Sequence, residues 1–336
     1  MLLVRHISFY FVGSILVLFL GFTVTVIFAA IAINPKTAAA TDYLSSTYLN
    51  TPPPVLEVPL TLKIVTFNIA DGYLFTTNRH ERIRAIAALL TKLDPDIVGL
   101  QECFIASDRQ LLVDSLKDSR LRYHADYPAA TVGNGLFTLS AYPIVEQYFH
   151  RFQANNPWYK IYQGDWWAGK GVGLARIQLP SGAQLDFYNT HAQAGRRDDD
   201  NRRVRDLQMR ELSAFLNESR SRTAPAFIVG DFNTRLDRPD LQYAIDHSGL
   251  KSVVTIDTGI DFIFAMENGL YDIEAVDTQT IEGSAPGSAA AIFLSRAPSP
   301  RELWKMWFGA GEETPLSDHT GYVSTITINI RASVSA

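Results

Sequence analysis

Cysteine is almost absent from this chain of 336 residues, and its scarcity excludes several classes of protein. Cys103 is the only cysteine, so no intrachain disulfide can form and a small disulfide-stapled fold is excluded. A structural zinc site made of clustered Cys and His residues is not expected either. At 47% hydrophobic residues, the chain can instead bury a large apolar core.

Positive charge is also in short supply, with 30 Lys and Arg against 35 Asp and Glu. Proteins that bind nucleic acid usually present a basic face. The one basic patch, Arg196–Arg197 and Arg202–Arg205, is interrupted by Asp198–Asp200. Nucleic acid is therefore not expected as a partner, and no protein partner is predicted. No G-x-S-x-G motif is positioned to supply a serine nucleophile.

Charge is missing altogether from residues 7–33, which are rich in Phe, Leu, Val and Ile. This run exceeds the roughly 20 residues needed to cross a bilayer, whereas the apolar core of a signal peptide has about 7–15. We therefore predict a cytoplasmic N-terminus (1–6) and a single-pass transmembrane anchor (7–33). The alternative is a long signal peptide cleaved near residues 38–40. Arg5 precedes the run, which favours a catalytic part outside the cytoplasm.

Residues 34–60 are predicted to be a linker, because Ala and Thr dominate the first half and Pro52–Pro54 stiffens the second. From residue 61 to 331, strand-like and helix-like runs alternate with hairpin-like strand pairs. This mixture predicts one α/β (α+β) domain, a four-layer sandwich of two mixed β-sheets flanked by helices. Residues 279–314 are predicted to be an inserted loop with a short aromatic helix.

Three helices and several strands follow from periodicity. Each helix is given with its predicted inner face: 82–93 (Ile83, Ile86, Ala87, Leu90), 109–119 (Leu111, Leu112, Ser115, Leu116) and 203–219 (Leu207, Leu212, Phe215, Leu216). The predicted strands are 62–69, 96–102, 135–152, 171–179, 183–191, 226–233, 261–266 and 322–330.

Polar residues stand at or beside the ends of these apolar runs. They are Asn68, Glu102, His191, Asp231, Asn233, Asp261 and the pair Asp318–His319. Carboxylates such as Glu102 are hard oxygen ligands that suit Mg²⁺ or Mn²⁺, and Asn68 can serve as a neutral ligand. Asp231 could accept a proton from water, and Asn233 could donate a hydrogen bond to a phosphoryl oxygen. The set predicts a metal-assisted phosphoesterase.

His319 is suited to acid, base or phosphate-donor chemistry near neutral pH. Its neighbour Asp318 cannot easily pair with it, so another carboxylate must fix its tautomer. Asp261 lies alone in an apolar run, where an unpaired carboxylate would be costly, and is the candidate. His191 would supply a second imidazole.

These segments resemble the endonuclease/exonuclease/phosphatase superfamily, which has the fold of pancreatic deoxyribonuclease. Within it the chain is most similar to Mg²⁺-dependent neutral sphingomyelinases over about residues 61–331. The likeness to sphingomyelinases rests on GNGL (133–136), GDWWAGKGVGL (164–174) and TPLSDH (314–319). Arg205 and Gln208 match a helix pattern of the family as well.

The resemblance implies a role for each matching position. Glu102 would hold Mg²⁺ (Mn²⁺ is possible), helped by Asn68, and Asp318 would complete the metal or histidine shell. Asp231, Asn233 and His191 would contact water, phosphate or the leaving oxygen. His319 would be the general base or a phosphate-stabilising acid, held by Asp261. Asp165 and Lys170 match the family's Asp and Lys around the GDWWAGK-type loop, so Lys170 would meet the phosphate.

The expected substrate is a membrane phospholipid, sphingomyelin, hydrolysed in the manner of a phospholipase C to ceramide and phosphocholine. Trp166 and Trp167 join Trp158 and Tyr159 in an aromatic cluster around Asp165, and such rings can hold a quaternary ammonium group. Two alternatives stay open. One is a nuclease or inositol-phosphate phosphatase of the same superfamily, and the other is an inactive membrane-tethered binding module.

Overall fold

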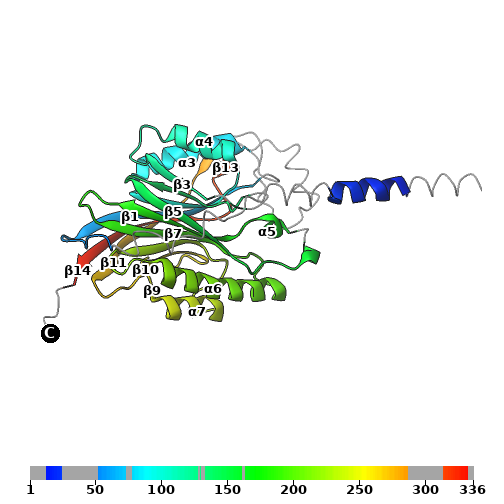
Figure 1. The fold of residues 1–336 in the computed structure, drawn as a ribbon. Coiled ribbons are helices and arrows are strands. Elements are labelled where there is room, and N and C mark those ends of the chain that lie inside the picture. Colours follow the sequence, from blue (N-terminus) through cyan, green and yellow to red (C-terminus); the bar gives the residue numbers. More distant parts are fainter. Residues whose placement is uncertain are drawn as a thin grey trace, which may run out of the picture.

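Two six-stranded β-sheets lie face to face in the computed structural model (Figure 1). The structure describes residues 13–24, 52–72, 78–127, 129, 133–160, 163–286 and 313–331. In spatial order the first sheet holds β11 (Tyr271–Ile281), β14 (Gly321–Ile330), β1 (Leu60–Asp71), β2 (Ile97–Cys103), β4 (Phe137–Ser140) and β3 (Tyr123–Asp126). The second holds β5 (Ile144–Arg151), β6 (Gly171–Gln178), β7 (Gln184–His191), β8 (Ala226–Asp231), β10 (Asp261–Met266) and β9 (Leu250–Ser252).

Both sheets are mixed, and each contains a parallel pair that a helix connects. β1 is parallel to β2, and β7 is parallel to β8, whereas the other pairs are antiparallel. Parallel neighbours need a crossover. Here the crossovers run through α3 (Arg79–Leu93) and α6 (Asp199–Ser219). The remaining elements are α4 (Ala106–Ser115), η3 (Trp158–Lys160), α5 (Gly164–Trp167), α7 (Pro239–Ser248) and the hairpin of β12 (Ser284–Pro286) with β13 (Glu313–Pro315).

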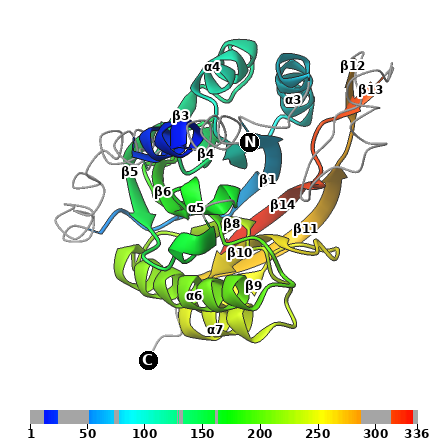
Figure 2. The ribbon, with the colours of Figure 1, turned by 90° about the vertical axis from the view of Figure 1, so that its right-hand side faces the viewer.

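Apolar packing holds the four layers together. Between the sheets, Ile64 and Ile97 of the first lie in one buried cluster with Phe187 and Phe227 of the second. On the outer faces, α3 and α4 cover the first sheet, and α6 and α7 cover the second (Figure 1, Figure 2). Burying one such side chain fully is worth about 1.5–3 kcal/mol, so the strands' apolar runs fix the sandwich. The predicted fold of two mixed sheets flanked by helices is confirmed.

The helix predictions are confirmed in part. All four residues of the predicted inner face of α3 are buried. In α4 the helix stops at Ser115, which is exposed, so the prediction that Ser115 faces inward and that the helix reaches residue 119 is wrong. Leu207 of α6 is 45% exposed, because the buried stripe passes through Val204 and Gln208 instead.

The predicted strand 135–152 is two strands in different sheets. β4 ends at Ser140 in the first sheet, and β5 begins at Ile144 in the second. Pro143 lies between them, and a proline has no N–H with which to continue a ladder. The chain therefore crosses from one sheet to the other at this point.

The segments predicted to flank the domain fall largely outside the described residues. Residues 13–24 are helical with their apolar side chains exposed, and no helix within the described residues is long and apolar enough to cross a membrane. Of the predicted linker, residues 52–59 are described and dock on the domain. The Leu56 N–H donates to the Tyr271 hydroxyl at 3.0 Å, and the Thr223 hydroxyl donates to the Pro53 carbonyl at 2.9 Å.

The predicted inserted loop begins later than expected. β11 extends to Ile281, and β12 and β13 then pair with each other, so both margins of the stretch 279–314 are strand. The predicted aromatic helix lies outside the described residues.

The strand directions bring one end of each sheet to a common rim. In the second sheet, His191 at the end of β7 is opposite Asp231 at the end of β8, and Asp231 is opposite Asp261 at the start of β10. In the first sheet, the end of β1 lies beside the start of β14, with Thr66 opposite Tyr322. Residues far apart in sequence therefore meet at this rim.

At Gly230 the neighbouring strand leaves no room for a side chain. Its φ is +151°, and a Cβ there would lie 2.0 Å from the carbonyl oxygen of Thr190. We predict that Gly230→Ala lowers the free energy of unfolding by about 3 kcal/mol, because the neighbouring strand must shift. Chemical denaturation measures this. Gly164→Ala is the control, since nothing lies within 4 Å of its Cβ position. Equal losses in the two variants would contradict the prediction.

Candidate active site

The amide of Asn68 joins the two sheets at the rim. Its side chain is buried near the end of β1, and its Nδ2 donates to Glu102 Oε1 at 3.1 Å and to Asp231 Oδ2 at 3.2 Å. Its Oδ1 accepts from the backbone N–H of Ala70 at 3.1 Å. One amide group therefore aligns a carboxylate of β2 with a carboxylate of β8.

Glu102 is held in an uncommon backbone conformation. Its φ is +53°, in the left-handed region that costs a residue other than glycine about 1–3 kcal/mol. Gly135 packs so closely against it that a Cβ on Gly135 would lie 3.2 Å from Glu102 Cα. The side chain is 33% exposed. Burial raises the pKa of Glu102, while Lys170 and the Asn68 hydrogen bond oppose that rise. This carboxylate thus keeps an accessible oxygen beside a buried site.

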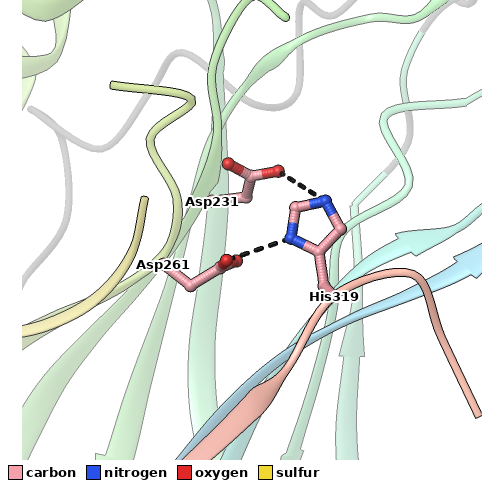
Figure 3. A group of neighbouring side chains, drawn as sticks. All are labelled: Asp231, Asp261 and His319. Atoms are coloured by element: carbon pink, nitrogen blue, oxygen red, sulfur yellow. Dashed lines mark hydrogen bonds and ion pairs between the residues drawn. The ribbon is translucent and has the colours of Figure 1, made fainter. Parts of the chain in front are cut away.

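Asp231, Asp261 and His319 form the second part of the site (Figure 3). His319 Nδ1 lies 3.0 Å from Asp261 Oδ2, and its Nε2 lies 3.7 Å from Asp231 Oδ2. One ligand atom from each of the three residues lies within 4.8 Å of the others. Because the Asp261 carboxylate can only accept, Nδ1 carries the proton and the imidazole has a fixed orientation.

The charges in this group shift one another's ionisation. Burial raises the pKa of Asp231 to about 7, with the negative charge of Asp261 adding to the rise. Burial raises the pKa of Asp261 as well, against the hydrogen bond to His319. Burial would lower the pKa of His319, but the hydrogen bond to Asp261 and the charge of Asp231 prevail and raise it to about 10. The two carboxylates therefore favour the protonated form of His319.

His191 has the opposite character. Burial lowers its pKa well below the ordinary value, and the nearby charge of Lys170 lowers it further. Lys170 Nζ donates to His191 Nε2 at 2.8 Å and to the Ala192 carbonyl at 3.0 Å. An ammonium group can only donate, so Nε2 is the acceptor and His191 is a neutral imidazole with its proton on Nδ1. Lys170 also pairs with Asp165 of α5 at 3.0 Å.

The remaining predicted site residues lie around the two groups described above. Asn233 has a φ of +52°, its N–H donates to Asp231 Oδ1 at 2.8 Å, and its Nδ2 donates to the Ala192 carbonyl at 3.1 Å. Its amide thus fixes the rim. Asp318 is exposed and is not part of the group in Figure 3. Trp166 and Trp167 are half-buried on α5, with ring centroids 4.8 Å apart.

The sequence did not predict a role for Gln101 and Asn189, a buried polar pair next to the site. Gln101 Nε2 donates to Asn189 Oδ1 at 2.7 Å, and this bond joins β2 to β7 across the sandwich. Asn189 in turn donates to the Leu100 carbonyl at 3.0 Å. Both residues interrupt apolar strand runs, and a buried amide needs partners, so this interruption is the signal that could have found them.

The family's helix pattern also has a structural purpose here. Arg205 Nη1 donates to the Gln193 carbonyl at 3.0 Å, and Gln208 Oε1 accepts from the Gln193 N–H at 2.8 Å. Gln193 Nε2 donates to Asp165 at 2.9 Å. Arg205 and Gln208 therefore anchor the turn that follows His191 and that faces α5.

The fold and this set of residues define a class. The chain belongs to the Endonuclease/Exonuclease/phosphatase family, whose sequence profile matches residues 65–319. The predicted superfamily is confirmed by this match. The predicted likeness to neutral sphingomyelinases is confirmed as well, because the chain is 32% identical over 188 residues to a putative neutral sphingomyelinase of Drosophila melanogaster, a match that covers 55% of this chain and 42% of that one.

The relatives of this chain within the family are named for the lipids on which they act. The chain is 33% identical over 174 residues to the inositol phosphosphingolipids phospholipase C of Schizosaccharomyces pombe, and 30% identical over 176 residues to human (Homo sapiens) sphingomyelin phosphodiesterase 2. The matches cover 51% and 52% of this chain, but each spans only 41% of the relative's length.

Solved structures share the fold. Sphingomyelinase C of Streptomyces griseocarneus has a TM-score of 0.57 at 18% identity, covering 79% of this chain and 99% of that one. A variant of beta toxin from Staphylococcus aureus, solved with bound magnesium ions, has a TM-score of 0.58 at 17% identity, with coverages of 79% and 99%.

The Asp261–His319 pair yields a prediction about ionisation. Asp261→Asn keeps the size of the side chain but removes the charge, so the pKa of His319 should fall from about 10 toward its ordinary value. Turnover should fall about 10²-fold or more, since the tautomer is no longer fixed. NMR titration of the ring protons measures the pKa. Asp257→Asn, which changes an exposed carboxylate nearby, is the control. An unchanged pKa of His319 in Asp261→Asn would refute the assignment.

Proposed function

We propose that this chain is a metal-dependent phosphodiesterase that hydrolyses sphingomyelin, in the manner of a phospholipase C, to ceramide and phosphocholine. The observation that carries the proposal is the meeting of Asn68, Glu102 and Asp231 beside His191 and His319 at one rim. Relatives named as sphingomyelin and inositol phosphosphingolipid hydrolases support it.

The donor set at the rim fits a hard divalent cation. Glu102 and Asp231 offer carboxylate oxygens to the space beside the Asn68 amide, and oxygen donors suit Mg²⁺, with Mn²⁺ as an alternative. The group in Figure 3 suits Mg²⁺ less well, because it includes an imidazole and because Asp261 and His319 already bond each other. We therefore assign Glu102 as the principal ligand. A cation bound there would neutralise charge on the phosphoryl oxygens and stabilise the leaving alkoxide.

The protein's own groups would move the proton. The Asp231 carboxylate would accept a proton from a water molecule. Of the two roles considered for His319, the acid is favoured, because the Asp261 and Asp231 carboxylates face both ring nitrogens and stabilise the protonated ring. An imidazolium can donate a hydrogen bond to a phosphoryl oxygen or a proton to the leaving oxygen. The Lys170 ammonium, which bonds His191, Ala192 and Asp165, would attract the same phosphate as a nearby positive charge and would orient neutral His191 beside it.

Aromatic side chains near Asp165 favour a choline head group. Trp166 and Trp167 are half-buried on α5, while Trp158 is 80% exposed. An indole face attracts a quaternary ammonium group by about 0.5–2 kcal/mol, depending on solvation. The similarity to the inositol phosphosphingolipid hydrolase favours one alternative, a sphingolipid with an inositol phosphate head group.

A substrate panel tests the proposal. Sphingomyelin, an inositol phosphosphingolipid, an inositol phosphate and supercoiled DNA are each incubated with the full chain, with EDTA and then with Mg²⁺ restored. We expect phosphocholine release from sphingomyelin, lost with EDTA and regained with Mg²⁺. DNA nicking as the sole activity would overturn the lipid assignment.

The metal assignment has its own test on that panel. Glu102→Ala should abolish turnover while the thermal unfolding midpoint stays close to that of the parent, because the side chain is partly exposed and strained. Glu81→Ala, at an exposed position on α3, is the control and should keep full turnover. Substantial residual turnover in Glu102→Ala would remove Glu102 from the site.

We also propose that residues 7–33 form a single-pass membrane anchor and that the catalytic domain lies outside the cytoplasm. The uncharged apolar run supports the anchor, and Arg5 before the run supports the orientation. The anchored chain should stay with membranes after alkaline carbonate washing, and its amino-terminal peptide should be found by mass spectrometry. A mature chain that begins after residue 38 would show a cleaved signal peptide instead.

A further inference from the structure

Arg82 is a buried cation that bonds two chain segments beside the site, namely the end of β1 and the residues before β14. It lies in the first turn of α3, and its side chain is only 1% exposed. Burying a guanidinium is costly unless hydrogen bonds compensate, so its partners show what it stabilises. Burial lowers the pKa of Arg82 to about 10, which still leaves it charged at neutral pH.

Backbone carbonyls of two distant segments accept hydrogen bonds from Arg82, and the negative charges of Asp71, Asp318 and Asp108 also stabilise it. Nε and Nη2 donate to the Leu316 carbonyl at 2.9 and 2.7 Å. Nη2 also donates to the Ile69 carbonyl, and Nη1 donates to the Ala70 carbonyl at 3.4 Å. One guanidinium thus bonds the end of β1 and the segment that precedes β14.

Each of these carbonyls belongs to a segment that bonds Asn68 or His319. Ile69 follows Asn68, and the Ala70 N–H holds the Asn68 amide oxygen. Ala70 has a φ of +47°, so this turn needs outside support. Leu316 precedes Ser317, whose hydroxyl donates to the Asn68 carbonyl at 2.6 Å and accepts from the His319 N–H at 3.1 Å.

We infer that Arg82 is a positioning residue, which clamps the end of β1 to segment 316–319 and thereby keeps Asn68 in register with His319. The inference rests on the proposed function, because it assigns Arg82 to the geometry of that reaction. A lysine keeps the charge but cannot reach carbonyls of both segments with a rigid planar fork. Arg82→Lys therefore separates the clamp from the charge.

Arg176 offers a matched control. It is fully buried on β6, and it bonds the carboxylates of Asp186 and Glu146 and the Ser219 carbonyl. β6 meets the rim through Gly171, which is opposite His191, whereas Arg176 lies toward the other end of that strand. Arg176→Lys should cost stability without reaching the site.

The experiment compares Arg82→Lys, Arg176→Lys and the parent chain. For Arg82→Lys we expect kcat to fall about 10²-fold with KM nearly unchanged, since a small misplacement near the chemistry costs this much. Calorimetric titration should show Mg²⁺ binding weakened about tenfold, as for other loss of support to metal ligands. Amide hydrogen exchange of residues 316–319 should accelerate. Arg176→Lys should change none of these.

Each other outcome decides the matter too. A folded Arg82→Lys that keeps parental kcat, Mg²⁺ affinity and exchange at 316–319 overturns the inference. If Arg82→Lys does not fold, Ser317→Ala replaces it, because it breaks the other bond between the same segments. Parental values in Ser317→Ala then overturn the clamp, and losses support it. A parent chain without any phosphodiesterase activity would refute the proposed function, while Mg²⁺ affinity and exchange would still test Arg82.

Discussion

The hydrogen bonds of Asn68 are the constraint on which the site depends. A single buried amide donates to one carboxylate from each sheet. The distance between Glu102 and Asp231 therefore depends on how the two sheets are placed relative to each other. Hydrogen bonds to charged groups are worth about 1.5–3 kcal/mol, and leaving such a buried group unpaired costs as much or more. A shift of one sheet relative to the other would break these hydrogen bonds. The same bonds therefore help to hold the two sheets in place.

Most of the ionisable side chains of the site are buried, among them Lys170, Asp231 and Asp261. Desolvation pushes the carboxylates toward their neutral forms, and the imidazolium of His319 and the ammonium of Lys170 oppose that push. The two histidines end in opposite states, because His319 has a carboxylate partner and His191 has a cation beside it. Such a separation of pKa values within one site is how a protein assigns an acid and a neutral partner at the same pH. A divalent cation would complete the balance of charge.

Several residues at the rim have strained backbone conformations, and buried side chains behind the rim support them. Glu102, Asn233 and Ala70 all adopt left-handed backbone conformations, and each is followed or preceded by a group that bonds the site. Such conformations persist only where the surroundings over-determine them. Buried side chains behind the rim provide that support, with Arg82 on one side and the pair Gln101–Asn189 below.

The amino-acid sequence determined the local part of this result. Apolar periodicity was enough for the face of α3, and residues such as Glu102, Asp231 and His191 could be recognised because each ends an apolar strand run. Short motifs were enough for the family. Periodicity failed at Ser115 and Leu207, where packing partners distant in sequence chose which residues of a helix were covered.

Tertiary structure alone decided the rest, because strand order and register are set by contacts between residues far apart in the chain. Only the fold showed that 135–152 changes sheets at Pro143, that Asp318 is exposed and that Lys170 donates to His191, whereas the pairing of His319 with Asp261 was already predicted from the sequence. Neither the burial of Arg82 nor the carbonyls that compensate it could be read from the sequence. Those carbonyls come from β1 and segment 316–319, while Arg82 itself comes from α3, and no local sequence pattern encodes the meeting of these three segments.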